Sequence, residues 1–457
     1  MKKFVPFLLS LLIVLTLPLQ TFAASLDEVI SIIESEYVGD IKGNLDNAES
    51  IDDVMEMLDP YSAYFTAEEY NAFIDSVDLK TVGIGIVIEK HEKGILIVDV
   101  VENGSAINSG IEAGDIITEV DGKSTVNIST EEAQTLLLGE ENTRVDLTIL
   151  KKDGTITHKL LTRQSFALPN VTTELLYGNV GYIALSSFSE DGAKLVKEAY
   201  NDLVSQGATS FILDLQYNGG GYVATAEELI GLFPNAPYAY NVKYSTGSEM
   251  IRSISQEVNF PKNTRLLVNR YSASASEMTT AAVLDQDAAI VYGEQTYGKG
   301  TMQGFYQFRD GSVLKLTIAE FFGPNGTVVK DVGLTPDIVT KSNPLYQAHF
   351  DSIAENLSNY KKLPSLENVP TTKTFKVSFS KDIKQQLVEN AVELVELGGD
   401  KVEVSLKANN SQLEVTPVEP LKAGSQYILI FHPTIQDNEG KNLKTGKYLH
   451  ITVQEEN

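Results

Sequence analysis

Strand-like and helix-like segments alternate between residues 171 and 340, and this alternation limits the fold more than any other feature of the 457-residue chain. The strand-like runs are VGYIALSSF, TSFILDLQ, TRLLVNR and AAIVYGE, and the helix-like runs between them are AKLVKEAYNDLVSQG, YVATAEELIGLF and SEMTTAAVLDQ. Parallel strands need crossover helices of this kind, so the segment predicts a largely parallel sheet covered by helices. In such sheets ligands bind beyond the carboxyl ends of the strands.

The segments on either side have different periodicities. Residues 24–80 carry apolar residues at helical spacing in LDEVISIIESEYV and IDDVMEML, followed by a helix stop, DPYS. Residues 81–165 predict strands, a turn-rich stretch, a helix that Ser129 opens as its N-cap, and a strand pair. Residues 341–370, which contain Pro344, Pro364 and Pro370, predict a polar connector. Residues 371–457 contain short, regularly spaced strands typical of a β-sandwich, namely TFKVSFS, KVEVSLK, QLEVTPV, QYILIFH and YLHITV. The expected fold class is therefore multidomain, α/β with an added all-β module.

The first 23 residues have the pattern of an export signal. Lys2 and Lys3 precede an apolar run that ends before a small-residue cleavage site at 21–23. A retained membrane anchor is the alternative, but the run is shorter than the roughly 20 residues that a spanning helix needs. We therefore expect a secreted or envelope-associated bacterial protein.

Composition excludes several classes of function. The chain has no cysteine, so it has neither disulfides nor a thiol nucleophile. A formal net charge of -26 argues against nucleic acid as a partner, because binding to phosphates requires a basic surface. The five histidines are scattered without the spacing of metal ligands, so we predict no metal and no cofactor.

The stretch YSASASEM, residues 271–278, is the first candidate for a catalytic group. It joins a predicted strand to a predicted helix and thus places Ser272, Ser274 and Ser276 where helix amides are free and negative charge is favoured. A tight packing joint of small residues is the alternative. The pattern alone does not choose among the three serines.

A serine needs a base, and residues 171–340 contain no histidine. The candidate base is Lys299 in TYGKGTMQG, although a Gly-Lys-Gly sequence is also typical of a surface turn. In an extended segment Gln303 would share a face with Lys299 and hold the amine without adding a charge. The glycines at 219–221 follow a buried-looking strand and could supply a backbone donor to an oxyanion.

The order of several motifs resembles that of the carboxyl-terminal processing peptidases, or tail-specific proteases, over residues 26–340. These motifs are LDPYS at 58–62, GSAINSGIEAGD, DLQYNGGG at 214–221, SASASE at 272–277, GKGTMQ at 298–303 and GLTPD at 333–337. The resemblance implies a PDZ domain at 81–165 and a crotonase-like α/β serine protease core at 166–340. The segment 371–457 resembles bacterial Ig-like modules.

The resemblance also assigns roles to residues. It implies that Ser274 is the nucleophile, Lys299 the general base and Gln303 the residue that orients the lysine. The backbone amides that it implies for the oxyanion hole belong to Gly220 and Ala275. The residues that it implies as supports behind the site are Glu277, Asp285 and Thr296.

A PDZ module binds a peptide C-terminus as an added strand and its carboxylate in a backbone loop. The residues expected to form that loop are Val82, Gly83, Ile84 and Gly85.

The function implied is an exported serine endopeptidase with a Ser–Lys dyad, acting on proteins selected by accessible C-terminal tails. The alternative is a non-catalytic peptide-binding envelope scaffold. Further expected partners are a cell-wall or envelope component at the C-terminal module and a second copy at the N-terminal helices.

Three positions depart from the family pattern. Gln216 replaces an arginine and Gly219 replaces a proline in the strand-end loop, so the loop need not be held in the usual way. Leu138 stands where many members carry an arginine thought to couple the PDZ module to the active site. We therefore do not expect the PDZ module of this chain to be coupled to the active site in the way of those members.

Overall fold

The computed structural model describes residues 24–455 apart from 102–103, 129, 342 and 385–390. The predicted export signal and the predicted N-cap Ser129 lie outside these residues. The chain divides into two compact units: residues 1–72 with 303–318, and residues 73–302 with 319–457. Within the described ranges, no helix is both long and apolar enough to cross a bilayer.

The smaller unit is built on the predicted N-terminal helices. Its elements are α1 (Leu26–Glu36), α2 (Ile51–Glu56), β1 (Ala63–Phe65), and the parts of β17 (Thr301–Gln307) and β18 (Val313–Phe322) that fall within 303–318. Strand β1 pairs antiparallel with β18. Val29, Ile33 and Val54 of the helices pack with Leu314 and Leu316 of β18 in one buried cluster. The helix α3 (Ala67–Val77) follows β1 and leads into the larger unit.

The predicted strand-rich module at 81–165 forms a sheet in the order β3-β4-β5-β7-β8, with β6 beside β5. Its elements are β3 (Ile86–His91), β4 (Gly94–Val100), β5 (Ile116–Val120), β6 (Lys123–Ser124), α4 (Thr130–Leu137), β7 (Arg144–Leu150) and β8 (Ile156–Thr162). Before and after this module, β2 (Lys80–Gly83) and β9 (Gln164–Ala167) pair antiparallel with each other. The chain thus enters and leaves the module side by side.

The α/β segment contains the predicted sheet, in the order β10-β11-β12-β15-β16-β19. All neighbours from β11 onward are parallel, and β10 is antiparallel to β11. The strands are β10 (Val171–Leu176), β11 (Val180–Leu185), β12 (Ser210–Asp214), β15 (Arg265–Val268), β16 (Ile290–Gly293) and β19 (Ile338–Val339). A hairpin of β13 (Tyr238–Tyr244) and β14 (Gly247–Arg252) pairs with β18 instead. The prediction of a largely parallel sheet is confirmed.

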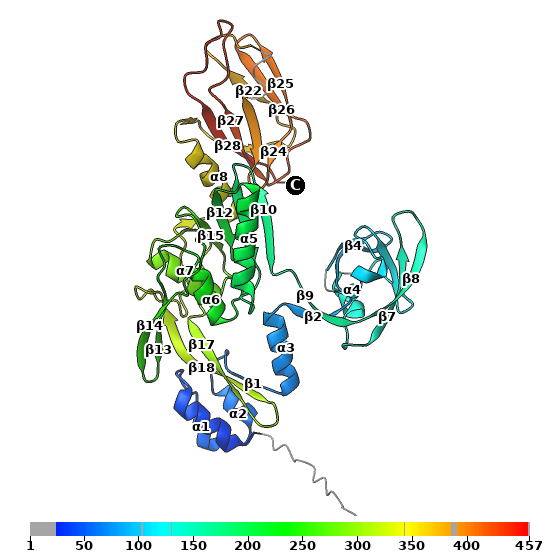
Figure 1. Ribbon diagram of the computed structural model, residues 1–457, viewed down its shortest axis with the longest axis vertical. Coiled ribbons are helices and arrows are strands. Elements are labelled where there is room, and N and C mark those ends of the chain that lie inside the picture. The colour runs from blue at the N-terminus through cyan, green and yellow to red at the C-terminus, as the bar shows by residue number, and fades with distance from the viewer. Residues whose placement is uncertain (1–23, 102–103, 129, 342, 385–390, 456–457) are drawn as a thin grey trace, which may run out of the picture. The chain divides into compact units, whose positions relative to one another are not determined.

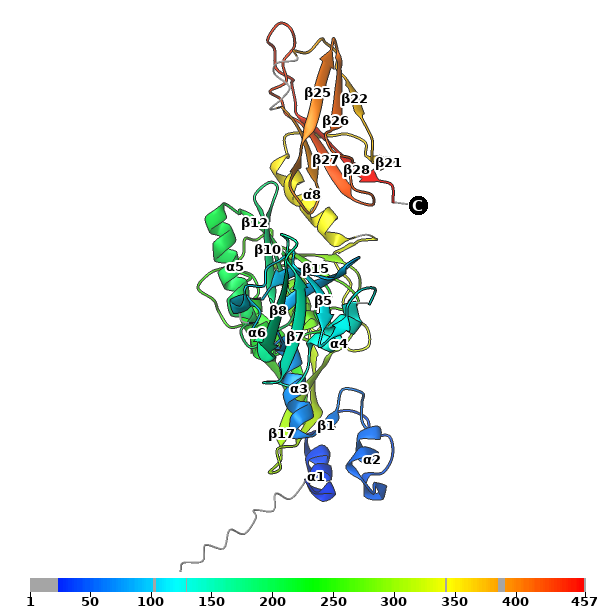
Figure 2. The same cartoon turned by 90° about the vertical axis from the view of Figure 1, so that its right-hand side faces the viewer.

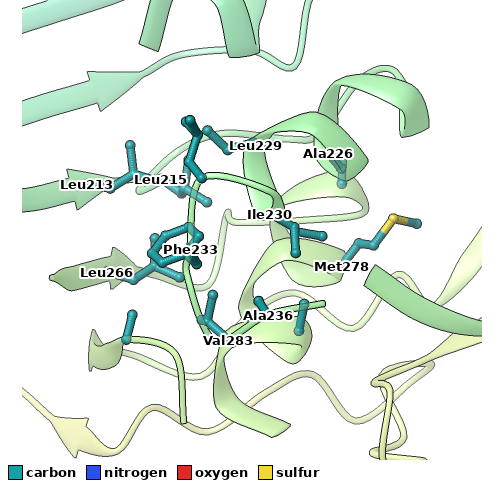
Figure 3. Close-up of a cluster of buried hydrophobic side chains, with 14 of the residues drawn as sticks. Leu213, Leu215, Ala226, Leu229, Ile230, Phe233, Ala236, Leu266, Met278 and Val283 are labelled. Carbon is teal, nitrogen blue, oxygen red and sulfur yellow. The ribbon is translucent and has the colours of Figure 1, made fainter. Parts of the chain in front are cut away.

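Helices cover this sheet (Figure 1). Successive strand residues point to opposite faces, so each face needs its own helices to bury it. One face packs against α5 (Gly192–Gln206), α6 (Val223–Ile230) and α7 (Ala275–Asp285). Figure 3 shows Leu213 and Leu266 of the sheet in one cluster with Ile230 and Val283 of the helices. The other face packs against α8 (Pro344–Asn356), where Ala348 lies with buried strand residues. The parallel strands carry their carboxyl ends to one edge, and the loops 215–222, 269–274 and 294–300 start there.

The C-terminal segment is a two-sheet sandwich, as predicted (Figure 2). One sheet has the order β20-β28-β27-β23-β24, with β21 also paired to β28, and the other has the order β22-β26-β25. The strands are β20 (Lys361–Lys362), β21 (Leu366–Val369), β22 (Phe375–Ser378), β23 (Val392–Glu396), β24 (Lys401–Val402), β25 (Val404–Asn409), β26 (Gln412–Pro417), β27 (Gln426–Phe431) and β28 (Lys447–Val453). The sequence analysis did not predict β20, β21 and β23.

The interpretation of residues 341–370 as a polar connector is wrong, since they contain α8, β20 and β21. Pro344 occupies the first turn of α8, where a missing N–H costs nothing and the fixed φ favours the helix. Asn343 caps that helix by accepting a hydrogen bond from the Leu345 amide. The prolines that suggested a connector therefore mark the limits of ordered elements.

Candidate active site

The three serines of 272–276 differ in their surroundings. Ser272 and Ser276 are fully buried, and their hydroxyls donate to the carbonyl oxygens of Leu215 and Asn218, each at 2.8 Å. Ser274 is half-buried and has φ 56° and ψ −113°, a conformation that few residues other than glycine adopt. It immediately precedes α7. Two of the serines therefore form the packing joint, and Ser274 is the one left accessible beside the first free amides of the helix.

One buried carboxylate connects the serine loop to the lysine loop. A single oxygen of Glu277, Oε2, accepts the amide N–H of Ser274 at 3.0 Å and that of Lys299 at 2.8 Å. Its other oxygen, Oε1, accepts the Gly298 amide at 2.6 Å and the Thr296 hydroxyl at 2.7 Å. Burial raises the pKa of Glu277, and these four hydrogen bonds oppose that shift by favouring the charged form. The two loops thus share one anchor.

Thr296 and Asp285, the other two predicted supports, lie in different places. Thr296 accepts the Leu334 amide at 2.8 Å while donating to Glu277, so it joins the GLTPD segment to the site. Asp285 ends α7, eleven residues after Ser274 and on the order of 15 Å along the helix axis. There it accepts from the amide of Asn325 and the hydroxyl of Thr327. The structure therefore brings Glu277 and Thr296 to the serine, but not Asp285.

The predicted oxyanion donors lie on either side of Ser274. Gly220 has φ +103°, and a Cβ added to it would stand 2.8 Å from the Ser274 Cβ, so this close approach requires glycine. Its N–H, however, donates to Oδ1 of Asn218 at 2.9 Å. Ala275 is the first residue of α7, and its N–H has no carbonyl one turn earlier in the helix to bond.

Asn218 and Asn269, which the sequence analysis did not single out, hold the loops together. Asn218 donates to the Leu185 carbonyl at 2.8 Å, and its own carbonyl accepts the Ala273 amide at 3.0 Å. Oδ1 of Asn269 accepts two amides, from Tyr217 and Tyr271. Asn218 stands within the quoted DLQYNGGG motif, which is the one signal that could have found it. These bonds hold the 216–219 loop without the arginine and proline of the family pattern.

Lys299 and Gln303 fall in different compact units. Lys299 is half-buried in the loop before β17, and its amide donates to Glu277. Gln303 lies in β17, which begins at Thr301, so the extended conformation expected after the lysine is observed. Nε2 of Gln303 donates to the Thr317 hydroxyl at 3.2 Å, and the Thr317 amide donates to Ser62 Oγ at 3.2 Å. The LDPYS motif therefore supports the strand that faces Gln303.

The PDZ-like module contains a cavity of about 300 Å³. The sides of this cavity consist of Thr81, Ile84, Gly85, Ile86, Val87, Ile88, Gln134, Leu137, Leu138, Phe166 and Leu168. Ile84 and Gly85 of the predicted carboxylate loop thus line it, whereas Val82 and Gly83 belong to β2. Gly85 has φ +75° and lies against Gly104, where a Cβ would meet the Gly104 Cα at 2.4 Å. Leu138, the departure from the family pattern, is itself part of the lining.

Across the described ranges, no group of three or more histidine, aspartate or glutamate side chains is arranged to hold a metal ion. The candidate site itself consists of a hydroxyl at a helix N-terminus, a lysine on an adjoining loop, and backbone donors around the hydroxyl. This arrangement can perform acyl transfer.

Comparisons with known proteins identify the modules. The model of peptidase family S41 matches residues 179–340, the PDZ domain model matches 74–150, and a bacterial Ig-like domain model matches 363–451. The fold and these matches define a serine-type peptidase with a PDZ domain.

Relatives identify the family. The carboxy-terminal processing protease CtpA of Bacillus subtilis is 30% identical over 337 residues, which cover 74% of this chain and 69% of that protein. A Staphylococcus aureus protein described as a "Probable CtpA-like serine protease" is 31% identical over 356 residues, covering 77% and 68%. The chain therefore belongs to the CtpA-like carboxy-terminal processing proteases. The solved photosystem II D1 C-terminal processing protease aligns with 72% of this chain and 95% of its own, at 23% identity and a TM-score of 0.45.

Proposed function

We propose that this chain is an exported serine endopeptidase in which Ser274 is the nucleophile and Lys299 the general base. The observation that carries the proposal is the shared Glu277 oxygen, which accepts the backbone amides of both residues. A carboxylate that fixes two backbones holds their side chains in one small region. It does so through the backbone, since its oxygens accept three backbone amides and the Thr296 hydroxyl.

The proposed reaction is a two-step acyl transfer. Ser274 Oγ attacks the carbonyl carbon of the scissile bond, and its proton passes to the neutral amine of Lys299. Collapse of the tetrahedral intermediate breaks the C–N bond, and Lys299 returns the proton to the leaving amine. Water then attacks the acyl ester and gives a proton to Lys299, the bond between Ser274 Oγ and the carbonyl carbon breaks, and Lys299 returns that proton to Oγ as the acid leaves. Gln303, four residues after the lysine, is proposed to orient its amine.

The oxyanion is proposed to bind to the amides of Ala275 and Gly220. At the N-terminus of α7 the helix dipole favours the negative charge that develops there. For Gly220 to donate to an oxyanion, its N–H must exchange the Asn218 side chain for the substrate. In this account Asn218 holds the loop in the absence of substrate.

Substrate selection is assigned to the PDZ cavity. Its lining is mostly aliphatic and includes Ile84 and Gly85 of the predicted carboxylate loop, which suits an apolar C-terminal residue and its carboxylate. We further propose export by residues 1–23, since the apolar run and cleavage site fit such a signal. An envelope partner for the Ig-like module and pairing of N-terminal helices remain predictions.

Cleavage of an unstructured protein with an apolar C-terminal tail tests the proposal. The mature protein is compared with Ser274→Ala, Lys299→Ala and the matched surface control Lys262→Ala. We expect cleavage by the wild type and by the control, loss in both site variants, and slower cleavage when the tail is amidated or ends in aspartate. Equal cleavage by all four proteins would refute the dyad. Tail binding without cleavage in the wild type would favour a peptide-binding scaffold.

A further inference from the structure

The most exposed aromatic side chains lie around the candidate nucleophile. Among the aromatic residues that the structure describes, Tyr217, Tyr297 and Tyr271 are the three most exposed, at 72%, 58% and 50%. Each belongs to a different loop at the carboxyl edge of the parallel sheet. Tyr217 directly precedes Asn218, Tyr271 directly precedes Ser272, and the Tyr297 amide donates to the Ser272 carbonyl at 3.1 Å. Exposed apolar surface gathered at one place marks a binding site more often than chance exposure does.

Two of these rings form a prearranged pair. Tyr217 and Tyr271 stack with ring centroids 5.5 Å apart and an interplanar angle of 19°. Their amides both donate to Oδ1 of Asn269, at 3.1 and 3.0 Å, so one side chain fixes both backbones. The Arg270 guanidinium lies 5.1 Å from the centroid of the Tyr271 ring. Both rings are therefore held in position while much of their surface stays in contact with solvent.

The backbone at Tyr217 does not favour a tyrosine. Its φ is 62°, in the left-handed region that glycine and asparagine adopt at lower cost than a bulky residue. At 72% exposure the ring also gains little from burial in the folded chain. Both the local conformation and the solvent thus favour a smaller or more polar residue. Apart from its stacking on Tyr271, the ring has little to gain within the folded chain, which favours a role in contact with a bound molecule.

We propose that Tyr217, Tyr271 and Tyr297 form a substrate-contact surface that binds large apolar or aromatic side chains of the polypeptide near the scissile bond. The inference rests on the proposed function of Ser274, since a chain cleaved there passes over these loops. Aromatic rings provide large contact area at low entropy cost and pack on apolar side chains of any sequence. This surface gives the enzyme a preference at the cleavage site, in addition to selection by the tail.

A paired set of peptides tests this surface. All carry the same apolar tail, and the residues flanking the cleavage site are either phenylalanine and leucine or serine and glycine. The variant Tyr217→Asn suits the left-handed backbone, so its melting temperature should equal or exceed that of the wild type. We expect its kcat/KM to fall about tenfold on the apolar-flanked peptides and to change little on the polar-flanked ones. Hydrolysis of a small activated ester without side chains should stay within about twofold.

The matched control is Tyr244→Asn, which alters an exposed tyrosine at the end of β13. It should leave both peptide classes unaffected. An unchanged preference in Tyr217→Asn overturns the inference, as does an equal loss on apolar peptides, polar peptides and the ester. Cleavage that persists in Ser274→Ala overturns the proposed function as well. Cleavage that requires Ser274 but ignores the flanking side chains overturns this inference alone.

Discussion

Glu277 and His349 are both fully buried, yet the hydrogen bonds around Glu277 favour its charged form and those around His349 favour its neutral form. Glu277 accepts four hydrogen bonds, which suit a charged carboxylate. His349 on α8 uses one ring nitrogen on each side: Nδ1 accepts the Gly398 amide at 2.8 Å and Nε2 donates to the Tyr177 carbonyl at 2.8 Å. That pattern requires a neutral imidazole. One group joins the loops of the site, and the other joins the C-terminal sandwich to the sheet.

The hydrogen bonds of Glu277 and those of His349 depend on different properties of the buried group. The Glu277 connection depends on the presence of an acceptor at both oxygens. The His349 connection depends on a protonation state, because a proton on Nδ1 would remove the acceptor for Gly398. Substitution should therefore break the first, and acid should weaken the second.

Replacing Glu277 by glutamine should have the largest effect. In glutamine an NH₂ group replaces one of the two carboxylate oxygens. Its N–H groups then face the two buried donors that this oxygen accepted, and those donors lose their acceptor. We expect a loss of about 2–4 kcal/mol in the free energy of unfolding and a fall in kcat/KM of at least about a hundredfold, because both loops lose their anchor. Denaturant melts and peptide kinetics measure the two effects. The control is Glu228→Gln, which makes the same change at a half-buried position on α6. A fully active Glu277→Gln would contradict the role of the carboxylate as the anchor of both loops.

His349 predicts a pH dependence of stability. Burial lowers the pKa of His349 to about 4, below the value of about 6.5 in an unfolded chain. Between these values the unfolded state binds more protons, so this contribution is complete above pH 6.5 and is lost as the pH falls toward 4. The loss amounts to at most about 3 kcal/mol. Melts of wild type and His349→Gln at several pH values measure it. The variant should lose stability more gradually over that window, and equal slopes would contradict the account.

Thr317 gives the smallest predicted effect. Thr317→Val removes the hydroxyl that accepts from Gln303 while keeping the shape of a side chain that is 1% exposed. If Gln303 orients the lysine, kcat/KM should fall about three- to tenfold, corresponding to one hydrogen bond of about 1 kcal/mol. Thr317→Ser keeps the hydroxyl and should retain wild-type kinetics. A valine variant as active as the serine variant would show that the Thr317 hydroxyl does not help Gln303 to orient the lysine.

The parts of the fold with strong periodicity could be predicted from the sequence. The strand–helix alternation after residue 171 predicted the parallel sheet, because each apolar run matched one buried element. The run 392–396, VELVE, was missed, since apolar residues at positions 392, 394 and 395 fit a helix or a strand until pairing with β27 decides. Pro344 suggested a break where it begins a helix.

The candidate site was predictable to a different extent. Ser274 and Lys299 stand in motifs whose residue types limit the chemistry. The roles of Asn218 and Asn269 were not predictable, because asparagine beside glycine is an ordinary turn residue and its partners come from other loops. The stacked ring pair depends likewise on two segments 54 positions apart in the sequence, Tyr217 and Tyr271, and no local pattern records that contact.

The most direct test of the central claim is to trap the acyl-enzyme and locate it by mass spectrometry. A slowly hydrolysed acyl ester is incubated with the wild type, Lys299→Ala and Ser274→Ala, and the modified peptide is identified after digestion. The account predicts one adduct on Ser274 in the wild type, a much slower one in Lys299→Ala and none in Ser274→Ala. An adduct on another residue, or equal rates in the wild type and Lys299→Ala, would contradict a Ser274–Lys299 dyad.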